Sequence, residues 1–202
     1  MQTTIFFDCE FLTREGALSR LWFGPRDPDP VVVQFGAVRL ALQDNFPILD
    51  RMRRYIQPRD RHGNTCALDP YFTRLTGVTE DDLRQHGMPL EDALRDLSEF
   101  AGPARLWSWG KDEFYLMALS CYIAGVPPPL PATRFGNVSE LILHSGMPYD
   151  TVIATRSNQL AAAFGVAPPG LRKHDALDDA LSIAHAVQHL LQNGKLAPET
   201  CL

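Results

Sequence analysis

TTIFFDCEF, at residues 3–11, joins β-branched and aromatic residues over the length of one strand and is interrupted by two acids, Asp8 and Glu10. This composition predicts a buried β-strand. Because side chains alternate across a strand, both carboxylates point to one face, and the residues between and beside them, Cys9 included, point to the other.

Two neighbouring carboxylates in an apolar strand are costly. Burying each ion costs several kcal/mol and the two charges repel each other, unless a proton or a cation neutralises them. Carboxylate oxygens favour Mg²⁺ or Mn²⁺. The alternative is that Asp8 and Glu10 end an edge strand and lie in solvent; the apolar residues on both sides argue against it.

The stretch VVVQFGAVRLAL at residues 31–42 predicts a second strand, and a third strand is expected to end near YIQP at 55–58. The three strands would form a meander. Gln34 is polar within the second strand and is expected to make a structural hydrogen bond. The connection at 12–30 is long for a hairpin, which leaves a functional loop and a disordered loop both open.

After Pro58 the apolar spacing becomes helical. Helices are predicted within 69–83 and 89–102, with Asp69 and Thr79 as N-caps and Gly77 and Gly102 as stops. A short strand at 104–109, a helix at 111–124, short helices around 138–146 and 157–165, and a long helix at 175–192 follow. This order predicts an α/β fold, a mixed sheet flanked by helices.

The composition suits one domain over residues 1–202, of which 45% are hydrophobic. With 19 basic and 24 acidic residues, the net charge of −5 excludes a generally basic surface for holding duplex by counterion release. The four cysteines are widely separated, which favours a reducing cytoplasm. No stretch is long and apolar enough to suggest a membrane partner.

A second group of acids lies near the far end, in HDALDDAL at 174–181. His174 begins a helix, and Asp179 follows five positions later, with Asp175 and Asp178 available to cap the first turn. Taken alone, acids at a helix N-terminus are ordinary. The same holds for Asp112, which alone would be an exposed acid at the start of a helix.

Five motifs in order carry a resemblance that no one of them carries alone. They are FFDCEF at 6–11, VVVQFGAVRL at 31–40, PYFTRLTGVT at 70–79, SWGKDEFYLMAL at 108–119 and HDALDDAL at 174–181. Together they resemble the DEDDh 3′-to-5′ exonuclease family. The resemblance runs from about residue 3 to residue 190 and implies a ribonuclease H-like fold.

The resemblance implies an active site of five residues: Asp8, Glu10, Asp112, His174 and Asp179. The four acids would hold two Mg²⁺ or Mn²⁺ ions, with Asp8 bridging them. His174, neutral at working pH, would accept the proton of the attacking water, a role worth roughly 10²–10⁴ in rate. Independently of any family, phosphodiester hydrolysis needs an activated water and charge relief on the phosphoryl oxygens, which two metals supply.

The resemblance also implies that side chains hold the end of a nucleic-acid strand by stacking on its last bases and wedging between them. Contacts with sugar and phosphate would not depend on the base sequence. The candidate contacts flank the motifs: Cys9, Phe11, Leu12, Phe72, Leu75, Thr76, Trp109, Lys111 and Phe114. Core packing is an equal alternative for Phe72 and Leu75 taken singly. A basic run, Arg51 to Arg61, either guides a longer substrate or is solvated surface.

The expected function is therefore 3′-to-5′ hydrolysis of single-stranded RNA or DNA ends. WSWGKD at 107–112 resembles RNA-processing members more than proofreading members, which favours RNA. The competing class is an inactive module of the same fold that binds 3′ ends; the complete set of five site residues argues against it. The family leaves a homodimer or a polymerase partner open.

Overall fold

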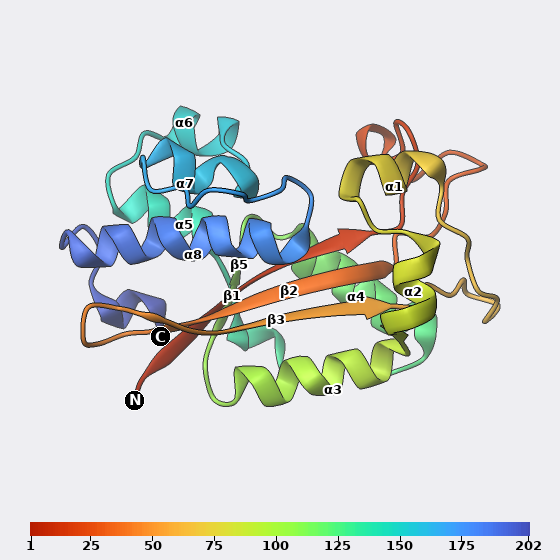
Figure 1. Ribbon diagram of the computed structural model, residues 1–202, viewed down its shortest axis with the longest axis horizontal. Coiled ribbons are helices and arrows are strands. Elements are labelled where there is room, and N and C mark those ends of the chain that lie inside the picture. The colour runs from red at the N-terminus through yellow and green to blue at the C-terminus, as the bar shows by residue number, and fades with distance from the viewer.

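The computed structural model describes residues 1–202 and contains a six-stranded sheet in the order β4-β3-β2-β1-β5-β6 (Figure 1). The predicted meander is its centre: β1 pairs with β2 and β2 with β3, both antiparallel. The outer strands pair in parallel, which makes the sheet mixed, as expected. The strands are β1 (Thr3–Phe11), β2 (Val32–Ala41), β3 (Ile48–Ile56), β4 (Gly87–Met88), β5 (Leu106–Ser108) and β6 (Phe135–Asn137).

Helices cover both faces of the sheet. They are α1 (Pro70–Thr76), α2 (Glu80–His86), α3 (Leu90–Ala101), α4 (Asp112–Ala124), α5 (Val138–His144), α6 (Tyr149–Ala154), α7 (Leu160–Ala163) and α8 (Ala176–Gln192). The long helix α8 crosses one face, with α5, α6 and α7 stacked beyond it, while α3 lies on the opposite side (Figure 1). None of these helices is both long enough and apolar enough to cross a bilayer.

The alternation of β1 divides the core in two. Phe6 packs with the residues of α5 and α8, whereas Ile5, Phe7 and Cys9 pack on the other face with α3 and α4. Asp8 and Glu10 share the parity of Phe6 and therefore face α8. The prediction that both acids share one face of a buried strand is confirmed.

The predicted helix ends are also confirmed. Asp69 accepts a hydrogen bond from the backbone N–H of Tyr71 at 2.8 Å and begins α1. Thr79 and Asp82 form a capping box at the start of α2, in which each side chain accepts from the other's backbone N–H. Gly77 ends α1 with a φ of +76°, a conformation that favours glycine.

Gly36 allows α8 to lie directly on the sheet. A Cβ at this position would overlap the backbone of Leu177 in the first turn of α8. Gly36 is also the cross-strand partner of Asp8 in the β1–β2 ladder. The absent side chain therefore lets the start of α8 approach the pair of strands that carries the acids.

The connection between β1 and β2 is ordered. It contains a short 3₁₀ turn, η1 (Leu18–Arg20), and Trp22 Nε1 donates a hydrogen bond to the carbonyl of Leu12 at 3.1 Å. Arg14 forms an ion pair with Asp69 at 3.8 Å, which ties this connection to the start of α1. The loop and α1 lie side by side at the end of the sheet where β1 finishes (Figure 1).

Candidate active site

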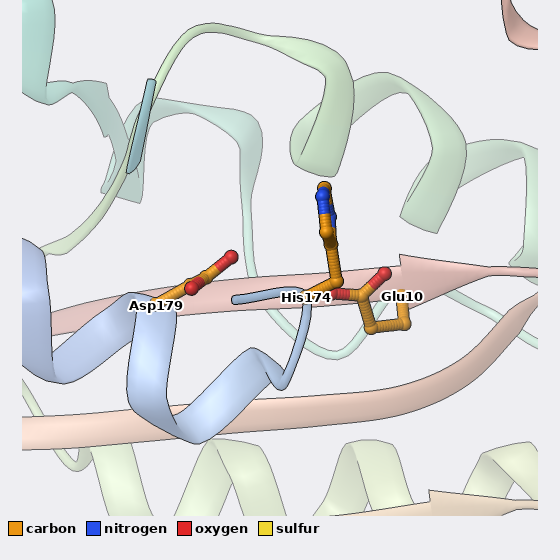
Figure 2. Close-up of side chains that lie close together, drawn as sticks. All are labelled: Glu10, His174 and Asp179. Atoms are coloured by element: carbon orange, nitrogen blue, oxygen red, sulfur yellow. The ribbon is translucent and has the colours of Figure 1, made fainter. Parts of the chain in front are cut away.

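Three side chains from distant parts of the chain converge at the end of β1. Glu10, His174 and Asp179 each offer a ligand atom, and these atoms all lie within 4.8 Å of one another (Figure 2). Glu10 comes from β1, His174 from the turn before α8, and Asp179 from α8 itself. Two carboxylates and an imidazole so close together form a group that can bind a metal ion.

Hydrogen bonds at the start of α8 explain why these residues meet. Gln34 is the cross-strand partner of Glu10, and its Oε1 accepts from the backbone N–H of Ala176 at 2.9 Å. The hydrogen bond expected for Gln34 is thus present, and it fixes the first residue of α8 beside the strand that carries Glu10. Asp179 is one turn further along the same helix.

His174 has an unusual backbone. Its φ is +59°, in the left-handed region, which costs a residue other than glycine about 1–2 kcal/mol. The imidazole is half-buried, and this burial lowers its pKa, with a smaller contribution from the nearby charge of Lys173. A lowered pKa keeps the imidazole neutral and able to accept a proton at neutral pH.

The acids are nearly inaccessible: Asp8 is 5% exposed, Glu10 8% and Asp179 3%. Burial, followed by the charge of Asp179, raises the pKa of Glu10 to about 8. Burial raises the pKa of Asp179 to about 7, against a hydrogen bond from the backbone of His174 that lowers it. Burial and then the charge of Glu113 raise the pKa of Asp8 well above its usual range.

These shifts have one physical meaning: without a cation, the negative charge of the site is poorly compensated. All the carboxylates offer oxygen ligands, which are the ligands that hard divalent ions prefer. The donor set therefore fits Mg²⁺ or Mn²⁺.

Glu113 is a buried acid close to Asp8 that the sequence motif did not single out. It is 6% exposed, its Oε2 is buried without a hydrogen-bond partner, and among the charged neighbours of Asp8 it raises the pKa of that acid most. Asp112, the predicted member, is the exposed first residue of α4 and raises the pKa of Asp8 least. Both acids of α4 therefore lie near Asp8, Glu113 buried and Asp112 exposed.

The helical spacing of residues in α4 distinguishes Glu113 from Asp112. The buried positions of α4 are Glu113, Met117, Ser120 and Cys121, an i, i+4, i+7, i+8 series. This series marks the face of α4 that packs on the sheet. Asp112 falls outside it.

Several predicted substrate contacts are buried in the core. Cys9, Leu12 and Phe72 belong to hydrophobic clusters, and Cys9 lies on the face opposite the acids. Thr76 is also buried, and its hydroxyl donates to the carbonyl of Phe72 at 3.0 Å. Lys111 is exposed, and Phe11, Leu75, Trp109 and Phe114 are partly buried.

No family model matches this sequence, and no curated protein matches it in sequence. The structure, in contrast, is similar to solved exonucleases. The nuclease domain of 3′hExo, a DEDDh family member solved with rAMP bound, superposes with a TM-score of 0.77 at 20% identity, covering 96% of this chain and 93% of that domain. The chain has the fold of the DEDDh exonucleases.

Two further solved nucleases are similar at lower TM-scores. The cell-death related nuclease CRN-4 matches with a TM-score of 0.69 at 18% identity, over 96% of this chain and 65% of that one. Exonuclease I of E. coli, solved with a dT13 oligonucleotide, matches with a TM-score of 0.61 at 18% identity, over 94% of this chain but 41% of that one. The shared part is thus a ribonuclease H-like fold.

Proposed function

We propose that residues 1–202 form one DEDDh-type exonuclease domain that removes nucleotides from the 3′ end of single-stranded nucleic acid. The observation that carries this proposal is the convergence of Glu10, His174 and Asp179, with Asp8 buried beside them, on this fold. The five motifs in the sequence support the same function independently of the superposition.

The acids would hold two divalent ions, Mg²⁺ or Mn²⁺. We assign Asp8, Glu10 and Asp179 as ligands, and Glu113 as the ligand from α4 in place of Asp112, because Glu113 is buried with an unpartnered oxygen. Such ions, when bound, activate water and neutralise charge on the phosphoryl oxygens. Their positive charge would also offset the repulsion among the acids, which adds to burial in raising the pKa values of Asp8 and Glu10.

His174 is the proposed general base. Its lowered pKa leaves the imidazole unprotonated at neutral pH, and its ring lies within the group formed with Glu10 and Asp179. It would accept the proton of the attacking water, which contributes roughly 10²–10⁴ to the rate.

The substrate is proposed to be a single strand, with RNA favoured over DNA. The solved neighbours include both kinds: 3′hExo was solved with rAMP, and exonuclease I of E. coli with deoxyoligonucleotides. WSWGKD at 107–112 favours RNA. The partly exposed Phe11, Leu75, Trp109 and Phe114, with Lys111, remain the candidate contacts with the strand end.

Incubation with single-stranded RNA and DNA, labelled at the 5′ end, tests the proposal. We expect a ladder of products shortened from the 3′ end with Mg²⁺ or Mn²⁺, none with chelator, and none from an Asp8→Ala protein. If neither substrate shortens with either metal, the exonuclease proposal is wrong. Fluorescence anisotropy of the same oligonucleotides then shows whether the chain binds 3′ ends without cutting them.

A further inference from the structure

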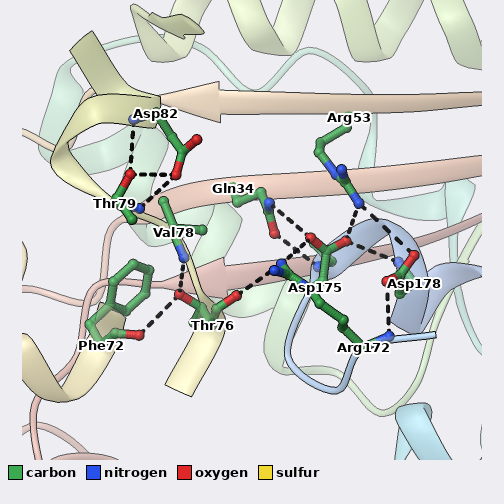
Figure 3. Close-up of polar contacts among 11 residues, drawn as sticks. Gln34, Arg53, Phe72, Thr76, Val78, Thr79, Asp82, Arg172, Asp175 and Asp178 are labelled. Carbon is green, nitrogen blue, oxygen red and sulfur yellow. Dashed lines mark hydrogen bonds and ion pairs between the residues drawn. The ribbon is translucent and has the colours of Figure 1, made fainter. Parts of the chain in front are cut away.

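Asp175 has far more polar contacts than a helix cap requires (Figure 3). Its carboxylate is inaccessible to solvent and caps α8 by accepting from the backbone N–H of Asp178 at 3.2 Å. Arg53 Nη2 also donates to it at 2.5 Å, and Arg172 Nη2 at 3.0 Å. One such bond to the backbone suffices to cap a helix, as Asp69 does for α1.

The two arginines come from different elements. Arg53 lies on β3, 122 positions away in sequence, and Arg172 lies in the turn that leads to α8. A buried carboxylate held by two guanidinium groups is fixed in position, because charge-assisted hydrogen bonds are the strong and directional ones. We call Asp175, Arg53 and Arg172 the clamp.

The clamp holds the turn that carries the site. Asp175 directly follows His174, whose left-handed backbone needs surrounding structure to maintain it. The backbone carbonyl of Asp175 accepts from the N–H of Asp179 at 2.9 Å. Two of the three converging residues, His174 and Asp179, are therefore tied directly to Asp175.

The clamp also reaches α1. Arg172 Nη2 lies 3.4 Å from the carbonyl of Thr76, and Arg172 Nη1 would lie 3.0 Å from a Cβ on Gly77 (Figure 3). This arginine thus contacts the C-terminal end of α1 and the turn of His174 together, so a displacement of α1 is transmitted to the turn.

We propose that Asp175 is a positioning residue: with Arg53 and Arg172, it holds the imidazole of His174 in the orientation that the reaction needs. The inference rests on the proposed function of the site. It assigns a rate-setting role to three residues that need touch neither substrate nor metal.

Asp175→Asn is the main test. Asparagine keeps the shape and the capping oxygen but loses the charge that pairs with both arginines. With a labelled single-stranded oligonucleotide, we expect kcat to fall roughly 10- to 100-fold, as for partners that orient site residues, with KM changed by less than about threefold. An unchanged kcat, or a change confined to KM, would contradict the proposal.

Arg53→Gln is a second test, and Arg51→Gln is its matched control. Both arginines lie on β3 at positions of the same parity, but only Arg53 reaches Asp175. Arg53→Gln should lower kcat and Arg51→Gln should not. The loss in an Asp175→Asn, Arg53→Gln double variant should be less than the product of the single losses, because one contact is removed twice. If Asp175→Asn does not fold, Arg53→Gln against Arg51→Gln decides the question.

Hydrogen exchange separates this proposal from the proposed function. In Asp175→Asn and Arg53→Gln, the amides of residues 173–179 should exchange faster than in the wild-type protein, while those of β1 stay protected. This result is expected even from a chain that cleaves no nucleic acid. Unchanged exchange at 173–179 in both variants would overturn the clamp, whatever the activity.

Discussion

Glu113 and Asp112 are adjacent acids with opposite environments, one buried beside Asp8 and the other exposed. Glu113→Gln should lower the proposed exonuclease activity by roughly 100-fold or more, because it removes a charge from the group proposed to bind the ions. Asp112→Asn, the matched control, should lower it by less than about tenfold. Steady-state kinetics and Mn²⁺ titration calorimetry check the pair, and a larger effect at Asp112 would restore that residue as the ligand.

The strained backbone of His174 gives a second pair of variants. His174→Ala and His174→Gly both remove the imidazole, so both should lower kcat by roughly 10²–10⁴. Only glycine relieves the left-handed strain, since φ of +59° costs it nothing in sterics. His174→Gly should therefore be more stable to unfolding than His174→Ala, by about 1 kcal/mol or less, because the greater entropy of glycine in the unfolded chain offsets part of the relieved strain. Urea denaturation measures the difference, and a His174→Ala protein that is the more stable of the two would show that the turn is unstrained.

For single residues, the sequence predicts which side chains lie together better than it predicts how deeply each one is buried. Strand alternation placed Asp8 and Glu10 on one face, and the resemblance carried by the five motifs implied His174 and Asp179, two of the three residues that converge. The motif in α4 was matched by residue type, which gave Asp112 but could not show that the adjacent Glu113 is the buried acid. Nor did the motif show that Cys9, between two predicted site residues in sequence, lies on the opposite face.

At the scale of the elements, the close packing of α8 on the sheet depends on one glycine, Gly36. In Gly36→Ala, the added methyl meets the backbone of Leu177, which cannot move aside as a flexible side chain would. We expect a loss of about 1–3 kcal/mol of stability from overpacking, and lower activity because α8 carries Asp179. Gly63→Ala, where nothing lies within 4 Å of the new methyl, should cost less despite a φ of +80°. Thermal melts compare the two, and an undisturbed Gly36→Ala protein would contradict the close approach.

Element prediction succeeded where the period could be read over many residues. The meander, α3, α4 and α8 have such runs, and side-chain caps mark the starts of α1 and α2. The strands β4 and β6 are two and three residues long, too short for a period, and exist because they pair with longer strands. The short helix α6 begins after Pro148 without a side-chain cap, so its start carried little signal.

The whole molecule should become less stable in the absence of metal as pH rises from 7 to 8. Glu10 ionises in the unfolded chain near its ordinary value of 4.5 but in the folded protein only at about 8. Its contribution to stability is therefore full below about pH 4.5 and is lost as pH rises toward 8. Above pH 7 the histidines with lowered pKa values are neutral in the folded protein and mostly neutral in the unfolded chain, where their ordinary value is 6.5, so they add only a small opposing trend.

Calorimetric melting at pH 7 and pH 8, with chelator and with Mn²⁺, tests this expectation. Stability with chelator should fall with pH, and the gain in Tm from Mn²⁺ should be larger at pH 8, because deprotonated acids bind the ion better. Glu10→Gln is the control and should flatten the trend. A Tm with chelator that rises between pH 7 and pH 8 would contradict the burial of this charge.

At the scale of the molecule, the sequence predicted the fold class but not the contacts that join distant segments. The order of elements favoured a mixed sheet, yet it could not say that β5 pairs with β1. Nor could it show that Arg53 reaches Asp175: the basic run around it suggested either a guide for substrate or solvated surface, and Arg53 instead forms an ion pair inside the protein. Such contacts depend on how the layers pack, which local patterns do not encode.

The left-handed turn at His174 has a consequence for protein engineering. A library of variants screened only for survival at high temperature would be expected to enrich glycine at this position and apolar residues at the crowded acids. Such variants would be more stable than the starting protein but would have lost the proposed activity. Any effort to stabilise this protein should therefore leave the end of β1 and the start of α8 unchanged, and change residues at the far edge of the sheet instead.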